Sequence, residues 1–145
     1  MSDIVIVSGY FNPLHIGHLR MLQAAKQIGD QLIVIVNNDV QQKMKKGKVI
    51  MEEAERLAIV KAIRYVDDAV IAVDSDPTVC KTIEKIALQH TGKTIIFGNG
   101  GDRKDPSLVP EVPVCQKYGI TMEYGVGGND KPNSSTNINK LLGRE

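Results

Sequence analysis

Two histidines, His15 and His18, lie three residues apart near the start of the chain. The apolar run from Ile4 to Val7 precedes them, and helical periodicity begins where they stand, so both imidazoles can face one anion. The amino end of a helix adds unpaired N–H groups and a partial positive charge. Gly9 is expected to let the chain turn tightly off the strand, and Gly17 to admit a ligand oxygen close to the backbone. These features predict a phosphate site.

The histidine pair has three other interpretations: a metal site, structural imidazoles, or an accidental loop composition. A metal site needs further ligands, but no third Cys, His or carboxylate stands at a ligand spacing, and His90 lies near the end of another predicted helix. A single histidine would be taken as structural, whereas two that flank a glycine at a strand-to-helix turn favour an anion. We therefore predict no metal ligands in the protein.

Two further polar segments could contribute to the same site. The densest positive charge in the chain follows the second apolar run and consists of Lys43, Lys45, Lys46 and Lys48. Such a run is ordinarily a solvated loop. The segment from Gly98 to Arg103 follows the fourth apolar run but opens no clear helix, so it is not a dinucleotide fingerprint. Ligands of open parallel sheets bind at the carboxyl edge where the strand order reverses, and there the histidine and glycine segments would meet.

Hydrophobic patterning indicates the elements that must position these residues. Four short runs rich in β-branched residues predict buried parallel strands at Ile4 to Val7, Leu32 to Val36, Ala69 to Val73 and Thr94 to Phe97. Helical periodicity lies between them, at Met21 to Ile28, Ile59 to Val66 and Val79 to Ala87. Ile120 to Tyr124 alternates as an edge strand would. This order predicts an α/β fold with an open, doubly wound, mostly parallel five-stranded sheet.

Turn and cap residues predict where the helices begin and end. Asp76 before Pro77 is typical of an N-cap, and Gly29 and Gly92 follow the last periodic residues of two helices. The stretch 125–135 is rich in Gly, Asn, Pro and Ser and predicts a loop, whereas 136–142 predicts a short closing helix.

Length and charge exclude several classes of protein. The 145 residues fit one domain, 1–145, and 18 basic against 17 acidic side chains leave a net charge of +1, which predicts neither a nucleic-acid nor a membrane partner. The apolar runs are too short to span a membrane, and the first residues lack the basic region of a signal peptide. Cys80 and Cys115 have no CxxC spacing, which predicts reduced thiols in a cytoplasmic protein.

The segment Gly-Tyr-Phe-Asn-Pro-Leu-His-Ile-Gly-His, from Gly9 to His18, resembles the HxGH signature of the cytidylyltransferase-like nucleotidyltransferases. This family includes glycerol-3-phosphate cytidylyltransferase, heptose-phosphate adenylyltransferase and archaeal FAD synthetase. Three further stretches match in order, so that the resemblance covers nearly the whole chain: Val36 to Asp39, Glu53 to Asp67 and Ser134 to Ile138. The resemblance implies a single Rossmann-like domain.

The resemblance also implies roles for individual residues. Those expected in catalysis are His15, His18, Lys45 and Thr136, with the imidazoles as hydrogen-bond donors rather than nucleophiles. Those expected to bind the nucleotide are Gly9, Tyr10, Phe11, Asn12, Gly17, Gly98, Asn99, Gly100, Gly101, Asp102, Arg103, Ser134, Ser135 and Thr136. Lys46 and Arg56 are expected to bind the acceptor. The alternative for Arg56 is a surface ion pair with Glu52 or Glu53, and for the Ser134 segment a simple N-cap.

The implied reaction is transfer of CMP or AMP from CTP or ATP to a sugar phosphate or polyol phosphate, with release of pyrophosphate. Mg²⁺ is expected with the triphosphate, and the resemblance suggests a homodimer. Transfer of AMP to FMN is an alternative, and so is a non-catalytic nucleotide-binding regulator. The regulator draws support from two departures, because several cytidylyltransferases have an acid at the position of Asn12 and an arginine at that of Asn129. Lys131 is a candidate substitute for that arginine.

Overall fold

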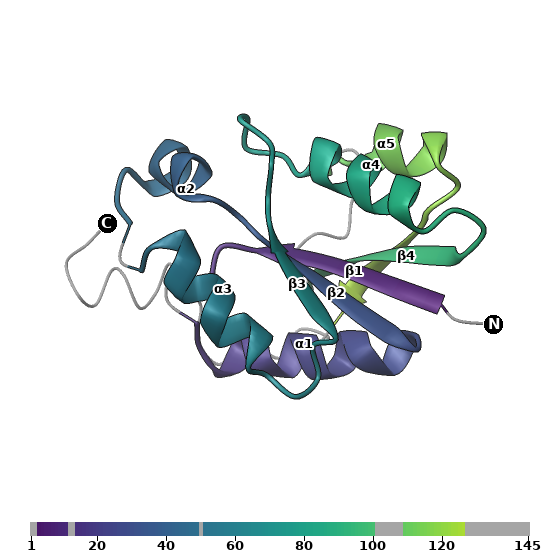
Figure 1. The fold of residues 1–145 in the computed structure, drawn as a ribbon, viewed down its shortest axis with the longest axis horizontal. Coiled ribbons are helices and arrows are strands. Elements are labelled where there is room, and N and C mark those ends of the chain that lie inside the picture. Colours follow the sequence, from purple (N-terminus) through teal and green to yellow (C-terminus); the bar gives the residue numbers. More distant parts are fainter. Residues whose placement is uncertain (1–2, 12–13, 50, 101–108, 127–145) are drawn as a thin grey trace.

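The computed structural model describes residues 3–11, 14–49, 51–100 and 109–126 of the chain. Within them, five parallel strands form one sheet in the order β3-β2-β1-β4-β5 (Figure 1). The strands are β1 (Asp3–Gly9), β2 (Gln31–Val36), β3 (Asp68–Ile71), β4 (Thr94–Gly100) and β5 (Thr121–Val126). The helices are α1 (Ile16–Ile28), α2 (Asp39–Lys46), α3 (Glu53–Lys61), α4 (Cys80–Gln89) and α5 (Val112–Lys117). The predicted α/β fold is confirmed.

Successive residues of the central strand β1 face opposite sides of the sheet. Ile4 and Ile6 belong to a core cluster with residues of α4 and α5, whereas Val5 and Val7 belong to a second cluster with residues of α1 and α3, such as Leu22. Figure 1 shows α1 and α3 on one face and α4 and α5 on the other. Both faces of the strand are therefore buried, which explains why its apolar run does not alternate with polar residues.

The strand order reverses at β1. The chain continues from β1 to β2 and β3 on one side, and then returns to place β4 and β5 on the other. Among the described pairs, β1 pairs with β2 from Ile4 to Gly9, whereas its pairing with β4 runs only from Asp3 to Ile6. The ladder between β1 and β4 thus stops short of the carboxyl end of β1. This is the edge at which ligands bind in sheets of this kind.

The helix α2 follows β2 and was not predicted. Six of its eight residues are polar, and three of the four clustered lysines lie on it, so the alternative interpretation of this run as a solvated loop is wrong for these three. The side chain of Asn38 caps its start by accepting a hydrogen bond from the Gln41 backbone at 2.9 Å. Gly47 ends it with a left-handed φ of 73°, as glycine commonly does.

Two predicted helix boundaries are also wrong. Helix α4 begins at Cys80, because the carboxylate of Asp76 accepts the backbone N–H and hydroxyl of Thr78 in a local turn instead of capping the helix. Helix α3 ends at Lys61. The apolar residues after it, including Ile63, still pack on the core from the connection to β3.

The last two strands are longer than predicted. Strand β4 continues to Gly100 and β5 to Val126, into segments that we expected to be loop. Strand β5 lies at the sheet edge, as predicted. The expected closing helix 136–142 lies outside the described residues. Within the described part of the chain, no helix has the length and apolar character needed to cross a membrane.

Candidate functional site

The histidine pair stands at the amino end of α1, as predicted. His15 is the N-cap residue, and its Nδ1 accepts a hydrogen bond from the Gly17 backbone at 3.0 Å. Nδ1 of His18 accepts one from the His15 backbone at 3.1 Å. The two ring centroids are 3.9 Å apart, and both residues are half-buried. The capping geometry therefore brings the two imidazoles together at a helix N-terminus.

These cap bonds determine which nitrogen of each ring carries a proton. A backbone N–H always donates, so both Nδ1 atoms must be unprotonated while they accept. A neutral imidazole then has its proton on Nε2. Each ring then carries an Nε2–H, which is a type of donor that a phosphate oxygen can accept. Protonation of Nδ1 would remove the acceptor and break the cap.

Phe11 shapes the connection between β1 and α1. Its φ of 53° lies in the left-handed region, which is uncommon for a residue other than glycine. Its ring is 1% exposed and meets the ring of His18 edge-on, with the centroids 4.9 Å apart. The core therefore supports the imidazole through this ring. Because the side chain is buried, the predicted contact of Phe11 with a nucleotide would have to come from its backbone.

Gly9 supplies room for the Phe11 ring. It is the last residue of β1, and a Cβ there would lie 2.7 Å from Cζ of Phe11. Real Cβ atoms essentially never approach a neighbour so closely. The tight turn expected at Gly9 is made two residues later, at Phe11.

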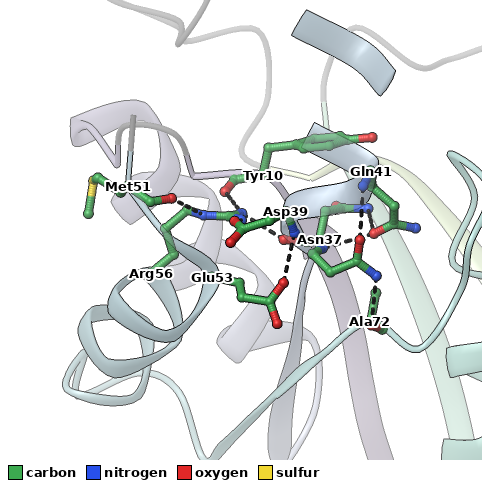
Figure 2. A network of polar contacts seen from close by, with 9 residues as sticks. Tyr10, Asn37, Asp39, Gln41, Met51, Glu53, Arg56 and Ala72 are labelled. Atoms are coloured by element: carbon green, nitrogen blue, oxygen red, sulfur yellow. Dashed lines mark hydrogen bonds and ion pairs between the residues drawn. The ribbon is translucent and has the colours of Figure 1, made fainter. Parts of the chain in front are cut away.

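Arg56, on α3, is fully buried at the same edge and joins four segments (Figure 2). Nε donates to the carbonyl of Met51 at 2.8 Å. Nη1 donates to the carbonyls of Tyr10 at 2.7 Å and Asn37 at 2.6 Å. Nη2 donates to the Asp39 carboxylate at 2.8 Å. One guanidinium thus links the ends of β1 and β2 to the first residue of α2 and to the segment before α3.

These contacts correct the alternative proposed for Arg56, a surface ion pair with Glu52 or Glu53. The ionic partner is Asp39, and the Arg56 side chain is 0% exposed. Four of the five N–H donors of the guanidinium already bond protein acceptors. A contact with the phosphate of an acceptor would require these bonds to open. Glu53 instead accepts the backbone N–H of Asp39 at 2.9 Å.

Two side-chain amides attach α2 to the connection between β3 and α4. Nδ2 of Asn38 and Nε2 of Gln41 each donate to two carbonyls, which belong to Ala72, Asp74, Asp76 and Thr78 at 2.8–3.0 Å. This role of the two amides was not predicted from the sequence. The signal was present, because Asn followed three positions later by Gln is a capping-box pattern at a helix start.

Lys45 and Lys46 occupy the last turn of α2. Cations there are favoured by the partial negative charge of a helix C-terminus. Lys45 is exposed, and its Nζ lies 4.4 Å from the centroid of the Tyr10 ring. The structure therefore brings one of the two predicted lysines next to the residue that follows β1.

The predicted base loop is described only in part. Gly98 is a buried residue of β4, and a Cβ there would lie 3.2 Å from side-chain atoms of Val7 and Val126. Asn99 and Gly100 continue the strand. The other predicted site residues fall outside the described part of the chain: Asn12, Gly101, Asp102, Arg103, Ser134, Ser135 and Thr136.

Neither cysteine has the surroundings of a nucleophile. Both are free thiols, and burial raises the pKa of Cys80 and takes the pKa of Cys115 to about 12, which keeps the thiols protonated at neutral pH. Within residues 3–11, 14–49, 51–100 and 109–126, no group of three His, Cys, Asp or Glu side chains could hold a metal ion.

Comparison with known proteins links this geometry to one family. A family model described as cytidylyltransferase-like matches residues 6–122. The match includes the paired imidazoles, the buried arginine and the lysine-bearing helix.

The chain is also similar to curated proteins, among them an FAD synthase and a bifunctional protein HldE. The FAD synthase of Pyrococcus abyssi is 50% identical over 68 residues, which is 46% of this chain and 46% of that protein. The bifunctional protein HldE of Geobacter metallireducens is 32% identical over 99% of this chain and 28% of that protein. The chain thus spans less than half the length of these relatives.

A solved structure extends the likeness to three dimensions. The lipopolysaccharide core biosynthesis protein from Thermoplasma volcanium superposes with a TM-score of 0.67 at 28% sequence identity, covering 86% of this chain and 95% of that one.

Proposed function

Since the chain belongs to the cytidylyltransferase-like family, we propose that it is a nucleotidyltransferase that moves CMP or AMP from CTP or ATP onto a phosphorylated small molecule and releases pyrophosphate. The observation that carries this proposal is the pair of imidazoles, 3.9 Å apart, that cap a helix at the carboxyl edge of a parallel sheet. The Nδ1 atom of each ring accepts a backbone N–H, and we propose the Nε2–H of each ring as a donor to a phosphate oxygen.

In the proposed reaction, a phosphate oxygen of the acceptor attacks the α-phosphorus of the triphosphate. The bond from that phosphorus to the bridging oxygen breaks, and its electron pair leaves with pyrophosphate. The protein forms no covalent intermediate, so its contribution is positioning and stabilisation of charge. His15 and His18 would donate to the phosphate oxygens that gain charge. Arg56 would act indirectly, because its bonds hold the backbone of Tyr10 and the start of α2.

We propose Lys45 as a cation for the triphosphate and Mg²⁺ as an ion that arrives on the phosphates. Bound Mg²⁺ would neutralise part of the phosphate charge. A homodimer remains a prediction from the family resemblance.

Two acceptors are favoured by specific likenesses. The match to HldE extends along 99% of this chain, which supports a sugar phosphate of the heptose kind. The 50% identity to an FAD synthase, although confined to 68 residues, supports FMN with ATP as the donor. Pyrophosphate release should be measured with CTP and ATP against glycerol 3-phosphate, heptose phosphates and FMN.

The decisive variants keep the helix cap and remove only the distal donors. Asn in place of His15 and Gln in place of His18 retain a cap acceptor, as in ordinary capping boxes. We expect His15→Asn and His18→Gln to fold normally and to lower kcat/KM by about 10²-fold or more, as loss of a transition-state donor does. Full activity in both variants would refute the assigned role. Binding of triphosphate by the wild type with no turnover on any acceptor would favour the nucleotide-binding regulator.

A further inference from the structure

A lysine and a tyrosine from distant parts of the chain meet beside the candidate site. Tyr10 directly follows the last residue of β1, and Lys45 lies in the last turn of α2. The Lys45 Nζ stands 4.4 Å from the centroid of the Tyr10 ring, within the range of a cation–π interaction. This contact connects the cationic end of α2 with the connection that leads to the histidine pair.

The backbone of Tyr10 is held independently of this contact. The buried guanidinium of Arg56 donates to the Tyr10 carbonyl at 2.7 Å, and the same guanidinium binds Asp39 at the start of α2 (Figure 2). The backbone of Tyr10 and the helix that carries Lys45 are thus both bonded to the guanidinium of Arg56. The two residues of the cation–π contact therefore come from segments that the same buried side chain holds.

Neighbouring residues of this connection have different surroundings. Phe11 is buried and supports His18 edge-on at 4.9 Å between centroids. Tyr10 is half-buried and meets Lys45, which is exposed. Two adjacent aromatic residues thus contact the two groups proposed to bind polyphosphate, an imidazole and an ammonium.

Lys45 has a long side chain with many rotamers. Its ammonium sits on a stem of four methylene groups, whose rotamers cost entropy to fix on binding. An aromatic face attracts an ammonium without neutralising its charge, so a cation–π contact is compatible with a cation that also binds an anion.

We propose that Tyr10 is a positioning residue, whose ring holds the Lys45 ammonium at the carboxyl edge of the sheet for contact with the polyphosphate of the nucleotide. This inference rests on the proposed function, because it assumes that a triphosphate binds beside the histidine pair. It assigns Tyr10 a role through Lys45, and it requires the ring but not the hydroxyl.

The test is a double-mutant cycle on the full chain, with Tyr10→Leu, Lys45→Met and both together, and Tyr10→Phe as the conservative variant. The dissociation constants of CTP and ATP are measured by calorimetry, and KM and kcat by pyrophosphate release. Tyr10→Leu is expected to weaken triphosphate binding and raise its KM about two- to fivefold, the strength of an exposed cation–π pair, with a smaller change in kcat. Tyr10→Phe keeps the ring and should therefore retain most of the triphosphate affinity of the wild type.

The decisive comparison is Tyr10→Leu in the Lys45→Met background. There we expect Tyr10→Leu to cause no further loss of triphosphate affinity. An equal loss in both backgrounds would overturn the proposal, since Tyr10 would then act by packing or by touching the nucleotide itself. A loss in Tyr10→Phe as large as in Tyr10→Leu would also overturn it. Tyr65→Leu is the matched control, because Tyr65 faces Arg64 at 5.2 Å in another part of the fold.

The two proposals fail in different ways. If the wild type binds a triphosphate but transfers nothing, the transferase assignment fails, while the calorimetric cycle still decides whether Tyr10 acts through Lys45. If it binds none of the triphosphates, both proposals are overturned.

Discussion

The space that Gly9 leaves for the Phe11 ring determines how the His18 imidazole is supported. Replacing Gly9 by Ala would place a methyl group 2.7 Å from the ring and push Phe11 from its buried position. We expect Gly9→Ala to lower the free energy of unfolding by about 1–3 kcal/mol, the usual result of overpacking, and to reduce turnover through displacement of His18. Urea denaturation and kcat measure the two effects.

A second substitution, at Phe11, tests whether Gly9→Ala destabilises the protein by crowding the Phe11 ring. Phe11→Leu removes the ring atoms that the new methyl group would meet. In the Phe11→Leu background, Gly9→Ala should cost clearly less stability than in the wild type. Equal losses in both backgrounds would show that Gly9 is required for its backbone conformation.

Arg56 is the residue on which the arrangement of several elements depends. Its loss would leave the Asp39 carboxylate and three carbonyls without their donor in a largely buried place. We expect Arg56→Met to lower the free energy of unfolding by about 3–5 kcal/mol, as breaking a buried ion pair does. Lys61→Met, at an exposed position of the same helix, should change it by less than about 0.5 kcal/mol. A normal stability of Arg56→Met with a raised KM for the acceptor alone would instead support the phosphate-binding role.

Asp67 joins α1, β2 and the segment before β3 in a pH-dependent way. Burial opposes its ionisation, but hydrogen bonds from Lys26 Nζ at 2.5 Å and Leu32 N at 2.7 Å outweigh that effect, and the pKa is lowered. A lowered pKa in the folded state stabilises the protein above the pKa of the unfolded chain, near 3.9, and this stability is lost as the pH falls through the folded value.

The pH dependence can be measured with Asp67→Asn. The side chain is 39% exposed, so we expect the variant to be only about 0.5–1 kcal/mol less stable than the wild type at pH 7. The difference should shrink as the pH falls below about 4. Glu55→Gln, an exposed change on α3, controls for the loss of one negative charge. A difference that is constant between pH 7 and pH 3 would contradict the assigned ionic contribution.

The molecule as a whole should respond to its nucleotide through thermal stability. A ligand at a hundred times its dissociation constant stabilises the folded state by about 2.7 kcal/mol. For a chain of this size that raises Tm by about 5–10 °C. Thermal unfolding with each of the four triphosphates and Mg²⁺ should therefore identify the donor by the largest rise. His15→Asn should reduce that rise, whereas no rise with any triphosphate would contradict a nucleotide site.

Local patterns in the sequence were sufficient to predict the strands, most of the helices and the position of the histidine pair. Parallel strands covered on both faces need continuous apolar runs, and a helix start needs a cap, so both leave a signal among neighbouring residues. The cap also places His15 and His18 together, because it involves only residues 15–18.

The remaining features depend on contacts between residues that are far apart along the chain. Helix α2 has few apolar residues, and it is held by amide bonds from Asn38 and Gln41 to carbonyls 34–37 residues away. Arg56 looks like a surface residue in the sequence, but acceptors 17–46 residues away bury it and complete its hydrogen bonds. Burial and hydrogen-bond partners at such separations arise only when the sheet has assembled, because only then do the ends of β1 and β2 come together around one side chain.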